Sequence, residues 1–206
     1  MKNPIRAALL ILLAFGTAQA VLAGPQVGKK APAFEAYDSN GRVVALAELA
    51  GSPVVLEWTN HDCPFVRKHY QSGNMQRLQR ELVEQGVKWI SVISSAPGLQ
   101  GYVSGEEANQ IAAKQGSYAD IILLDPRGVI GRMYGAKTTP HMFLIDENQV
   151  VRYMGAIDDR PSVQRSSLKG ASNLVRQAWT ALKAGENIAN PSTKPYGCGV
   201  KYASRD

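Results

Sequence analysis

The segment Trp58-Thr-Asn-His-Asp-Cys63-Pro-Phe-Val-Arg-Lys-His-Tyr70 places a cysteine between an apolar run and a helix-forming sequence. The apolar run, Pro53 to Trp58, predicts a buried strand. Cys63 falls where this strand gives way to a helix, and Pro64 suits the first helical position because no backbone N–H donor is needed there. The segment therefore predicts a strand–turn–helix unit with Cys63 at the helix N-terminus.

A cysteine at this position lies among unpaired backbone N–H groups and at the positive end of the helix dipole, and both favour the thiolate. Arg67, four residues further on, shares the helical face of Cys63 and adds positive charge, whereas Asp62 opposes it. We therefore expect the pKa of Cys63 to lie below the free value of about 8.5. The alternative is a buried and inert cysteine.

The order of a strand, a tryptophan and then Cys63-Pro-Phe-Val66 resembles the active-site turn of the thioredoxin superfamily. Cys63 stands at the first cysteine of the C-x-x-C motif of that superfamily, and Val66 stands at the second. Two longer strings, Cys63-Pro-Phe-Val-Arg-Lys-His-Tyr70 and Tyr196-Gly-Cys198-Gly-Val-Lys201, resemble the exported peroxiredoxin-like branch of the redoxins. That branch contains alkyl hydroperoxide reductase and thiol-specific antioxidant relatives, and the resemblance covers Val27 to Lys201.

The remaining chain alternates between strand-like and helix-like segments. Asn40-Gly41 lies between Phe34–Tyr37 and Val43–Leu46, a pattern typical of a hairpin. Apolar runs predict further strands at Val87–Ile93, at Ile121–Leu124, directly after Pro140, and at Val150–Met154. Helical signals predict helices after Cys63, around Met75–Leu82, from the capping box at Ser104 to Gly116, and from Ser172 to Gly185. This alternation indicates an α/β sandwich with a central mixed sheet flanked by helices, which is the thioredoxin-like fold.

Thr139-Pro140 precedes an apolar strand, at the place where thioredoxin folds have a cis-proline that faces the redox cysteine. The resemblance therefore implies a cis peptide bond here. It also implies that the backbone of Thr139 is exposed at the site, where an extended substrate strand could pair with it. His141 is expected to pack inward from the following strand.

The N-terminus has the features of a secretory signal. Lys2 and Arg6 precede an apolar run, Ala7 to Phe15, and small residues at Ala18-Gln-Ala20 and Val21-Leu-Ala23 offer two cleavage points. The alternative is a membrane anchor, but the run is far shorter than the roughly 20 residues that a membrane span needs. The sequence predicts export to the periplasm or the extracellular space, with membrane contact only through the uncleaved signal.

Composition fits one globular domain with two appendages, namely a signal peptide at 1–23, a thioredoxin-like domain at 24–185 and a tail at 186–206 that carries Cys198. Hydrophobic residues make up 45% of the chain and charged residues 19%, which is enough to bury a core. The net charge of +6 is mild and evenly spread, and this argues against nucleic acid as a partner.

Cys63 and Cys198 are the only cysteines, so an oxidising compartment allows one disulfide. The bond would close a loop of 135 residues, the difference between the two residue numbers. By reducing the conformational entropy of the unfolded chain, such a bond would stabilise the folded state by about 4–5 kcal/mol. A purely structural role is therefore a serious alternative. The prolines and glycines around Cys198 instead indicate a flexible tail, and a flexible tail favours an attacking thiol at Cys63 with Cys198 as its resolving partner.

Departures from the family patterns narrow the chemistry. The second cysteine of C-x-x-C is absent, so exchange within that motif cannot occur. When the peroxiredoxin pattern P-x-x-x-T-x-x-C is aligned on Cys63, Leu56 stands at the position of its proline and Asn60 at the position of its threonine. Thr59 is one residue out of register. The sequence therefore argues against peroxide reduction. It favours exchange with a substrate protein or a small thiol, supported by an external electron donor and without a cofactor.

Two further functions stay open. One is a redox-inactive binding module with a structural disulfide. The other is a copper or zinc carrier that uses His61 and Cys63, because imidazole and thiolate together suit these metals. His69 lies about 120° around the helix from Cys63 and should not reach the same ion. Apart from metal binding, His61 and Lys68 are expected either to tune the thiol or to lie in solvent.

The predicted site thus has two cysteines with chemical roles, Cys63 and Cys198. Residues expected to shape the site around them are Trp58, His61, Pro64, Arg67, Thr139 and Pro140. The acidic pair in Asp158-Asp159-Arg160 is expected to form a loop ion pair or a helix cap, since nothing else in the chain completes an acid–base site.

Overall fold

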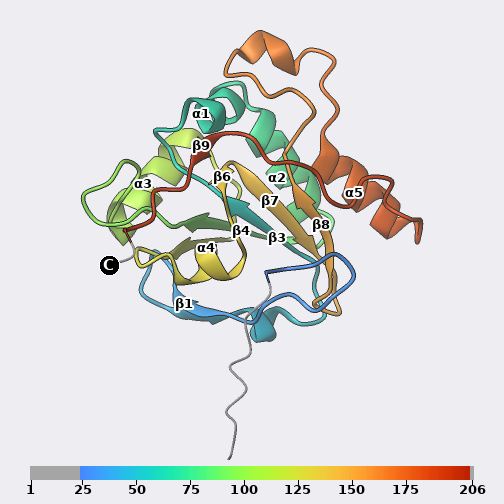
Figure 1. Ribbon diagram of the computed structural model, residues 1–206, viewed down its shortest axis with the longest axis horizontal. Helices are drawn as coiled ribbons and strands as arrows, with labels where there is room; N and C mark the ends of the chain where they lie inside the picture. Colours follow the sequence, from blue (N-terminus) through green and yellow to red (C-terminus); the bar gives the residue numbers. More distant parts are fainter. Residues whose placement is uncertain (1–23, 205–206) are drawn as a thin grey trace, which may run out of the picture.

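A five-stranded mixed sheet forms the centre of the molecule (Figure 1). The computed structural model describes residues 24–204, so the predicted signal at 1–23 lies outside the described part of the chain. In spatial order the strands are β5 (Ile121–Leu124), β4 (Lys88–Ile93), β3 (Val54–Trp58), β7 (His141–Ile145) and β8 (Val151–Gly155). β3 runs parallel to β4 and antiparallel to β7, which confirms the predicted mixed sheet.

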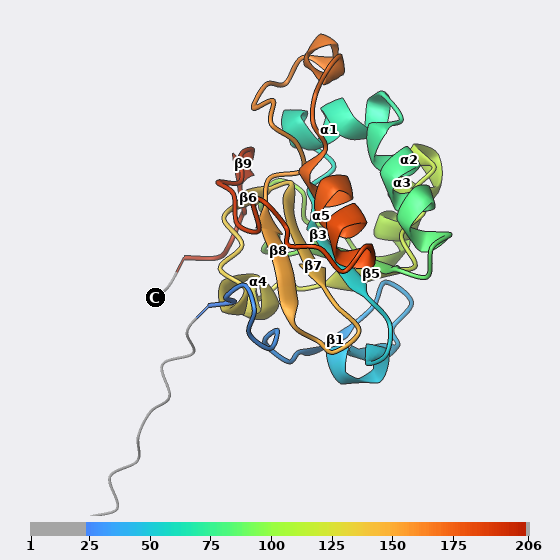
Figure 2. The same ribbon diagram turned by 90° about the vertical axis from the view of Figure 1, so that its right-hand side faces the viewer.

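Each face of the sheet has its own hydrophobic core. The face that carries Val55 and Trp89 is covered by α1 (Pro64–Gln71), α2 (Asn74–Val83) and α5 (Leu174–Lys183). The face that carries Leu56 and Trp58 is covered by β1 (Glu35–Tyr37), β2 (Val43–Ala45), the 3-10 helix η1 (Leu46–Leu49) and α4 (Val129–Met133). Figure 2 shows α1 and α2 on one side of the sheet and α4 on the other, so helices flank the sheet as predicted.

Two further helices complete the described part of the chain. α3 (Gly105–Gln115) contacts β5, and the short 3-10 helix η2 (Arg165–Leu168) precedes α5 at the surface. Within residues 24–204, no helix has the length and hydropathy that crossing a bilayer requires.

Local signals account for most of the element boundaries. The Ser104 hydroxyl accepts from the Glu107 amide at 3.2 Å while the Glu107 carboxylate accepts from the Ser104 amide at 2.7 Å, which confirms the capping box of α3. Gly73 separates α1 from α2 with a φ of 71°, in the left-handed region that favours glycine. The N-terminal hairpin is confirmed as well, because β1 and β2 pair antiparallel with Ala36 opposite Val44.

One boundary and one helix differ from the sequence prediction. The cap of α5 is Asn173, whose side chain accepts from the Arg176 amide at 2.8 Å, and not Ser172. The short helix α4 was not predicted, since its five residues give too little periodic signal for a sequence pattern to detect.

The C-terminal tail is docked along the domain, and the expectation of a flexible tail was wrong. Its residues first follow the edge strand β8, where the Met154 amide donates to the Pro191 carbonyl and the Thr193 amide donates to Met154, both at 3.0 Å. They then reach β6 (Thr138–Thr139), which pairs antiparallel with β9 (Cys198–Gly199). Unpaired backbone groups at two edges of the fold supply the hydrogen bonds that hold the tail.

Candidate active site

Cys63 is the N-terminal cap residue of α1, directly after the turn that leaves β3. The Cys63 amide donates to the Asn60 carbonyl at 3.0 Å, and the Asn60 side chain accepts from the Asp62 amide at 2.9 Å. Pro64 occupies the first turn of the helix, and the Cys63 carbonyl accepts the first helical hydrogen bond, from Arg67, at 2.8 Å. The predicted strand–turn–helix unit is therefore confirmed.

The loop before β7 lies against this cysteine. The Thr139–Pro140 peptide bond is cis, as expected, and the Cys63 thiol donates to the Thr139 carbonyl at 3.0 Å. This contact follows from the sheet order, because β3 and β7 are neighbours with Trp58 opposite His141. His141 is buried, which confirms that it packs inward.

The second cysteine reaches the same place from the far end of the chain. Cys198 lies opposite Thr139 in the β6–β9 pair, and its thiol is a neighbour of the Cys63 sulfur. Both cysteines are free thiols in this structure. The fold thus brings together two sulfurs that stand 135 residues apart in the sequence.

One expectation about Thr139 was wrong. Its backbone is not open to a substrate strand, because β9 of the same chain is paired with it and Thr139 is only 2% exposed. The approach is so close that a Cβ atom on Gly197 would overlap the Thr139 carbonyl oxygen. The tail itself occupies the edge that the sequence assigned to a substrate.

The contact between the two sulfurs shifts their pKa values in opposite directions. Burial raises the pKa of Cys63, but hydrogen bonds from Cys198 and from the Val66 amide help to lower it below the usual value. Burial raises the pKa of Cys198 to about 11, and the hydrogen bond and charge of Cys63 add to this. Cys63 is therefore the more acidic thiol of the pair.

A buried polar cluster holds the tail just before Cys198. We call it the tyrosine anchor, and its members are Lys68, His69, Asp158 and Tyr196. The Tyr196 hydroxyl donates to Asp158 and accepts from the Lys68 ammonium at 3.2 Å, and it lies 3.4 Å from the His69 ring. The Lys68 ammonium also donates to the Arg160 carbonyl at 2.9 Å and lies 3.7 Å from the Asp158 carboxylate.

Burial dominates the electrostatics of the tyrosine anchor. It lowers the pKa of Lys68, against the opposing effect of the Asp158 charge. It also lowers the pKa of His69 to about 3, and the neighbouring Lys68 charge acts in the same direction. His69 is therefore neutral at physiological pH, and Lys68 and Asp158 form the ion pair of the cluster.

Sequence reasoning missed this cluster. It expected Asp158 to form a loop ion pair or a cap, and Asp158 does accept from the Arg160 amide at 2.9 Å. In the sequence, its partner Lys68 on α1 is 90 residues away and its partner Tyr196 in the tail is 38 residues away. No local pattern could therefore reveal them. Lys68 is buried in the anchor and does not contact Cys63, so neither expectation for Lys68 is met.

Three residues expected to shape the site have no side-chain hydrogen bond to either cysteine in the described part of the chain. Trp58 is fully buried on the opposite face of the sheet, where its indole donates to the Ser94 hydroxyl at 3.0 Å. Arg67 is exposed on α1. His61 is partly exposed, and its ring lies 3.5 Å from the Asp62 carboxylate.

A buried carboxylate in β3 was also missed. Glu57 is fully buried and accepts from the Trp89 indole at 2.9 Å, the Tyr70 hydroxyl at 3.0 Å and the Gln79 amide at 3.1 Å. Burial raises its pKa, although these hydrogen bonds act in the opposite direction. A glutamate inside the apolar run Val54-Val-Leu-Glu-Trp58 was the signal that could have revealed it, since such a residue needs buried partners.

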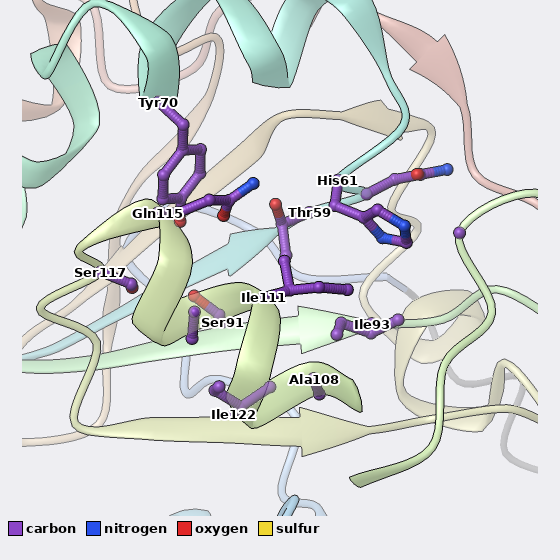
Figure 3. A pocket seen from close by; sticks show the side chains of 13 residues that line it. Thr59, His61, Tyr70, Ser91, Ile93, Ala108, Ile111, Gln115, Ser117 and Ile122 are labelled. Atoms are coloured by element: carbon purple, nitrogen blue, oxygen red, sulfur yellow. The ribbon is translucent and has the colours of Figure 1, made fainter. Parts of the chain in front are cut away.

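A small cavity lies beside the turn that carries Cys63 (Figure 3). Thr59 and His61 line it from the turn, and Ile111 and Gln115 line it from α3. Its volume is about 30 Å³, which is room for one or two water molecules and too little for a substrate. Cys63 is not among the residues that line this cavity, and its thiol is directed to the Thr139 carbonyl instead.

Metal ligands were a weak expectation at His61 and Cys63. Among residues 24–204, no group of three or more histidine, cysteine, aspartate or glutamate side chains is arranged to hold a metal ion. The Cys63 sulfur contacts Thr139 and Cys198, whereas the His61 ring contacts Asp62.

Comparison with known proteins gives a consistent result. The family described as Redoxin matches residues 26–171. The thiol:disulfide interchange protein DsbE of Vibrio cholerae is 31% identical over 138 residues, covering 65% of this chain and 68% of that protein. DsbE of Escherichia coli is 29% identical over 146 residues, which cover 69% of this chain and 72% of that protein.

Two solved structures resemble a larger share of the chain, and a third resembles a similar share. An uncharacterized conserved protein from Geobacillus kaustophilus has a TM-score of 0.74 at 25% identity, covering 88% of this chain and 94% of that one. A hypothetical protein from Sinorhizobium meliloti has the same TM-score at 22% identity, and the match covers 89% of this chain and 98% of that one. A putative thiol:disulfide interchange protein DsbE from Chlorobium tepidum has a TM-score of 0.51 at 28% identity, covering 64% and 85%. The family match ends before the tail, so Cys198 lies outside it.

Proposed function

The chain belongs to the redoxin family, and from this premise we propose that it is a thiol–disulfide oxidoreductase in which Cys63 reacts and Cys198 resolves. The observation that carries the proposal is that both cysteines meet at Thr139, whose carbonyl accepts from the Cys63 thiol and whose backbone pairs with that of Cys198. The similarity to thiol:disulfide interchange proteins supports the reaction class.

The proposed reaction has two exchanges. When the tail is released from its docked position, the Cys63 thiolate attacks a substrate disulfide, forms a mixed disulfide and expels one substrate thiolate, which takes up a proton. Cys198 then loses its proton and attacks the Cys63 sulfur, expels the second substrate thiolate and leaves a Cys63–Cys198 disulfide. The substrate gains two electrons and the protein loses two, so an external thiol donor must return them.

The other predicted site residues have supporting places in this proposal. Pro64 starts the helix whose N-terminus faces the thiolate, and Thr139 with Pro140 forms the wall against which both sulfurs lie. Arg67 is proposed to act through its charge on α1, since its backbone amide, and not its side chain, hydrogen-bonds to Cys63. Trp58 and His61 are proposed to act only by packing and by forming the turn.

We also propose that the protein works after export, in the periplasm or outside the cell. Support comes from the charged, apolar and small-residue pattern of residues 1–23, and an oxidising compartment would allow the disulfide. N-terminal sequencing of the mature protein from a periplasmic fraction should find a start after Ala20 or Ala23. A full-length protein in the cytosolic fraction would contradict export.

The substrate is proposed to be a protein or a small molecule that carries a thiol or a disulfide. An antioxidant role would then consist of reducing oxidised thiols. Direct peroxide reduction has less support, because Asn60 replaces the threonine of the peroxiredoxin pattern and its side chain instead donates to the Gln100 carbonyl at 3.2 Å. A peroxide-consumption assay should show a much lower rate than disulfide exchange.

The test is the behaviour of the cysteine pair. The oxidised protein should yield a Cys63–Cys198 linked peptide, with a reduction potential of roughly −120 to −270 mV, the range of exchange proteins. Cys198→Ala should keep the fold and accumulate a mixed disulfide on Cys63, and Cys63→Ala should be inactive. A potential below about −300 mV, or unfolding on reduction, would make the bond a structural staple. Tight stoichiometric copper or zinc binding that His61→Ala abolishes would establish the carrier function instead.

A further inference from the structure

The tail is fixed to the domain on both sides of Cys198. Before it, the Tyr196 ring packs edge-on against Phe65 with ring centres 5.7 Å apart, and its hydroxyl is held in the tyrosine anchor. After it, the Val200 amide donates to the Lys137 carbonyl at 3.1 Å. Only a few residues separate the two attachments, so the position of Cys198 over the site is well defined.

This docking covers one sulfur more than the other. Cys63 is 0% exposed, whereas Cys198 lies at the surface of the tail and is partly exposed. The backbone edge of Thr139 beside Cys63 is filled by β9, and a Cβ at Gly197 already finds no space there. A second polypeptide strand therefore cannot reach Cys63 along this edge while the tail is docked.

Oxidation fixes the tail over Cys63 until the disulfide is reduced. In the reduced protein only hydrogen bonds and packing hold the tail, so it can leave and expose Cys63. In the oxidised protein the Cys63–Cys198 bond itself ties the tail down. The sulfur that a reducing thiol meets is then set by the docked geometry.

We propose that external thiols reduce the protein by attacking Cys198, so that the tail cysteine, and not Cys63, carries the mixed disulfide with the electron donor. The inference rests on the proposed function and adds the point of electron entry. The donor thiolate forms a bond to the Cys198 sulfur, the Cys63–Cys198 bond breaks, and Cys63 leaves as a thiolate. A second donor thiolate then attacks the donor sulfur, releases the oxidised donor as a disulfide and leaves Cys198 to take up a proton.

The electrostatics of the site favour the same direction of cleavage. Attack at Cys198 expels the sulfur whose pKa is lowered, and attack at Cys63 would expel the sulfur whose pKa is raised to about 11. A thiolate of lower pKa leaves faster in exchange reactions. Access and leaving-group stability therefore select the same sulfur.

The experiment follows glutathione onto the oxidised full-length protein. The linked peptide is first confirmed in the starting material, glutathione is added, and samples are quenched in acid, alkylated and mapped by mass spectrometry. We expect at least about tenfold more glutathione on Cys198 than on Cys63 at early times. If the linked peptide is absent, the proposed function fails. If it is present and Cys63 carries as much glutathione as Cys198, only the present inference fails.

Two glycines beside Cys198 supply a matched pair of variants. Gly197→Ala should push the backbone beside Cys198 away from Thr139 even while the disulfide holds Cys198, because a Cβ at Gly197 would overlap the Thr139 carbonyl at a φ of 145°. The opened edge should shift glutathione toward Cys63. A Cβ at Gly199 meets nothing within 4 Å, so Gly199→Ala should keep the wild-type distribution. Circular dichroism checks that both variants fold. Equal distributions in Gly197→Ala and Gly199→Ala would show that docking of the tail does not select the sulfur.

Discussion

At the scale of single residues, each sulfur shifts the pKa of the other, in addition to the effect of burial. Burial alone would raise the pKa of both thiols. The Cys198 hydrogen bond reverses this for Cys63, because a thiol that donates to a thiolate stabilises the charged form. The position of Cys63 at a helix N-terminus, which the sequence revealed, is thus only part of the reason for its acidity.

The first prediction concerns the titration of the reduced protein. Thiolate absorbance should rise in two steps, the first below the usual cysteine pKa for Cys63 and the second near pH 11 for Cys198. Cys198→Ala should abolish the second step and move the first to higher pH, because the donor to the Cys63 thiolate is lost. A first step that stays unchanged in Cys198→Ala would show that the helix N-terminus alone determines the pKa of Cys63.

Local sequence signals were enough to place some residues of the site and not others. Cys63 and Thr139-Pro140 were found because each belongs to a short string with its own structural meaning. The tyrosine anchor was missed because burial decides its role, and burial depends on contacts between distant segments. Glu57 lies between these cases, since its place in an apolar run was a visible anomaly without a visible partner.

At the scale of secondary structure, α1 and the tail are coupled. α1 presents Cys63 at its first turn and buries Lys68 and His69 at its last turn. Tyr196 binds the last turn, and Cys198 binds the residue at the N-terminal end. The tail therefore spans the length of one helix and contacts it at both ends. Element positions could be predicted from caps and turns, but this long-range docking could not.

The second prediction tests the tyrosine anchor with Tyr196→Phe. The variant keeps the ring against Phe65 and loses the hydroxyl that links Asp158 to Lys68. A hydrogen bond to a charged group contributes about 1.5–3 kcal/mol, so the population with a lifted tail should rise by roughly ten- to hundredfold. Alkylation of Cys63 by iodoacetamide in the reduced protein should accelerate by the same factor, because Cys63 is covered while the tail is docked.

Tyr118→Phe is the control for this measurement, since Tyr118 is 42% exposed and far from the tail in the sequence. It should alkylate at the wild-type rate. An unchanged rate in Tyr196→Phe would mean that the hydroxyl does not contribute to docking.

At the scale of the whole molecule, the fold buries two neutral histidines, and this makes its stability depend on pH. Burial lowers the pKa of His69 to about 3 and that of His141 to about 4. Between these values and about 6.5 the unfolded chain binds protons that the folded chain does not, so stability falls as the pH decreases. Glu57 acts in the opposite direction, because its raised pKa lets the folded state bind a proton first.

The third prediction isolates one of these histidines by comparing His141→Gln with the wild type. Loss of the titrating ring should remove about 2 kcal/mol of the destabilisation that the wild type suffers between pH 7 and pH 5. Urea unfolding at both pH values gives the difference, in which the contributions of Glu57 and other groups cancel. A stability difference between variant and wild type that is independent of pH would show that His141 titrates normally in the folded protein.

The last prediction compares the oxidised and reduced forms of the molecule. The tail is docked with both thiols free, through the tyrosine anchor and the backbone pairs of β9, so the reduced protein should stay folded and unfold cooperatively. The disulfide acts mainly on the unfolded chain, where closing a loop of 135 residues removes conformational entropy equivalent to about 4–5 kcal/mol. Urea unfolding with and without a strong reductant should therefore show this difference in stability, with Cys198→Ala resembling the reduced protein under both conditions. A much smaller difference would mean that the bond strains the folded state, because the loss of chain entropy is set by loop length alone. A reduced protein that unfolds without denaturant would mean that the disulfide, and not the docked tail, holds the domain together.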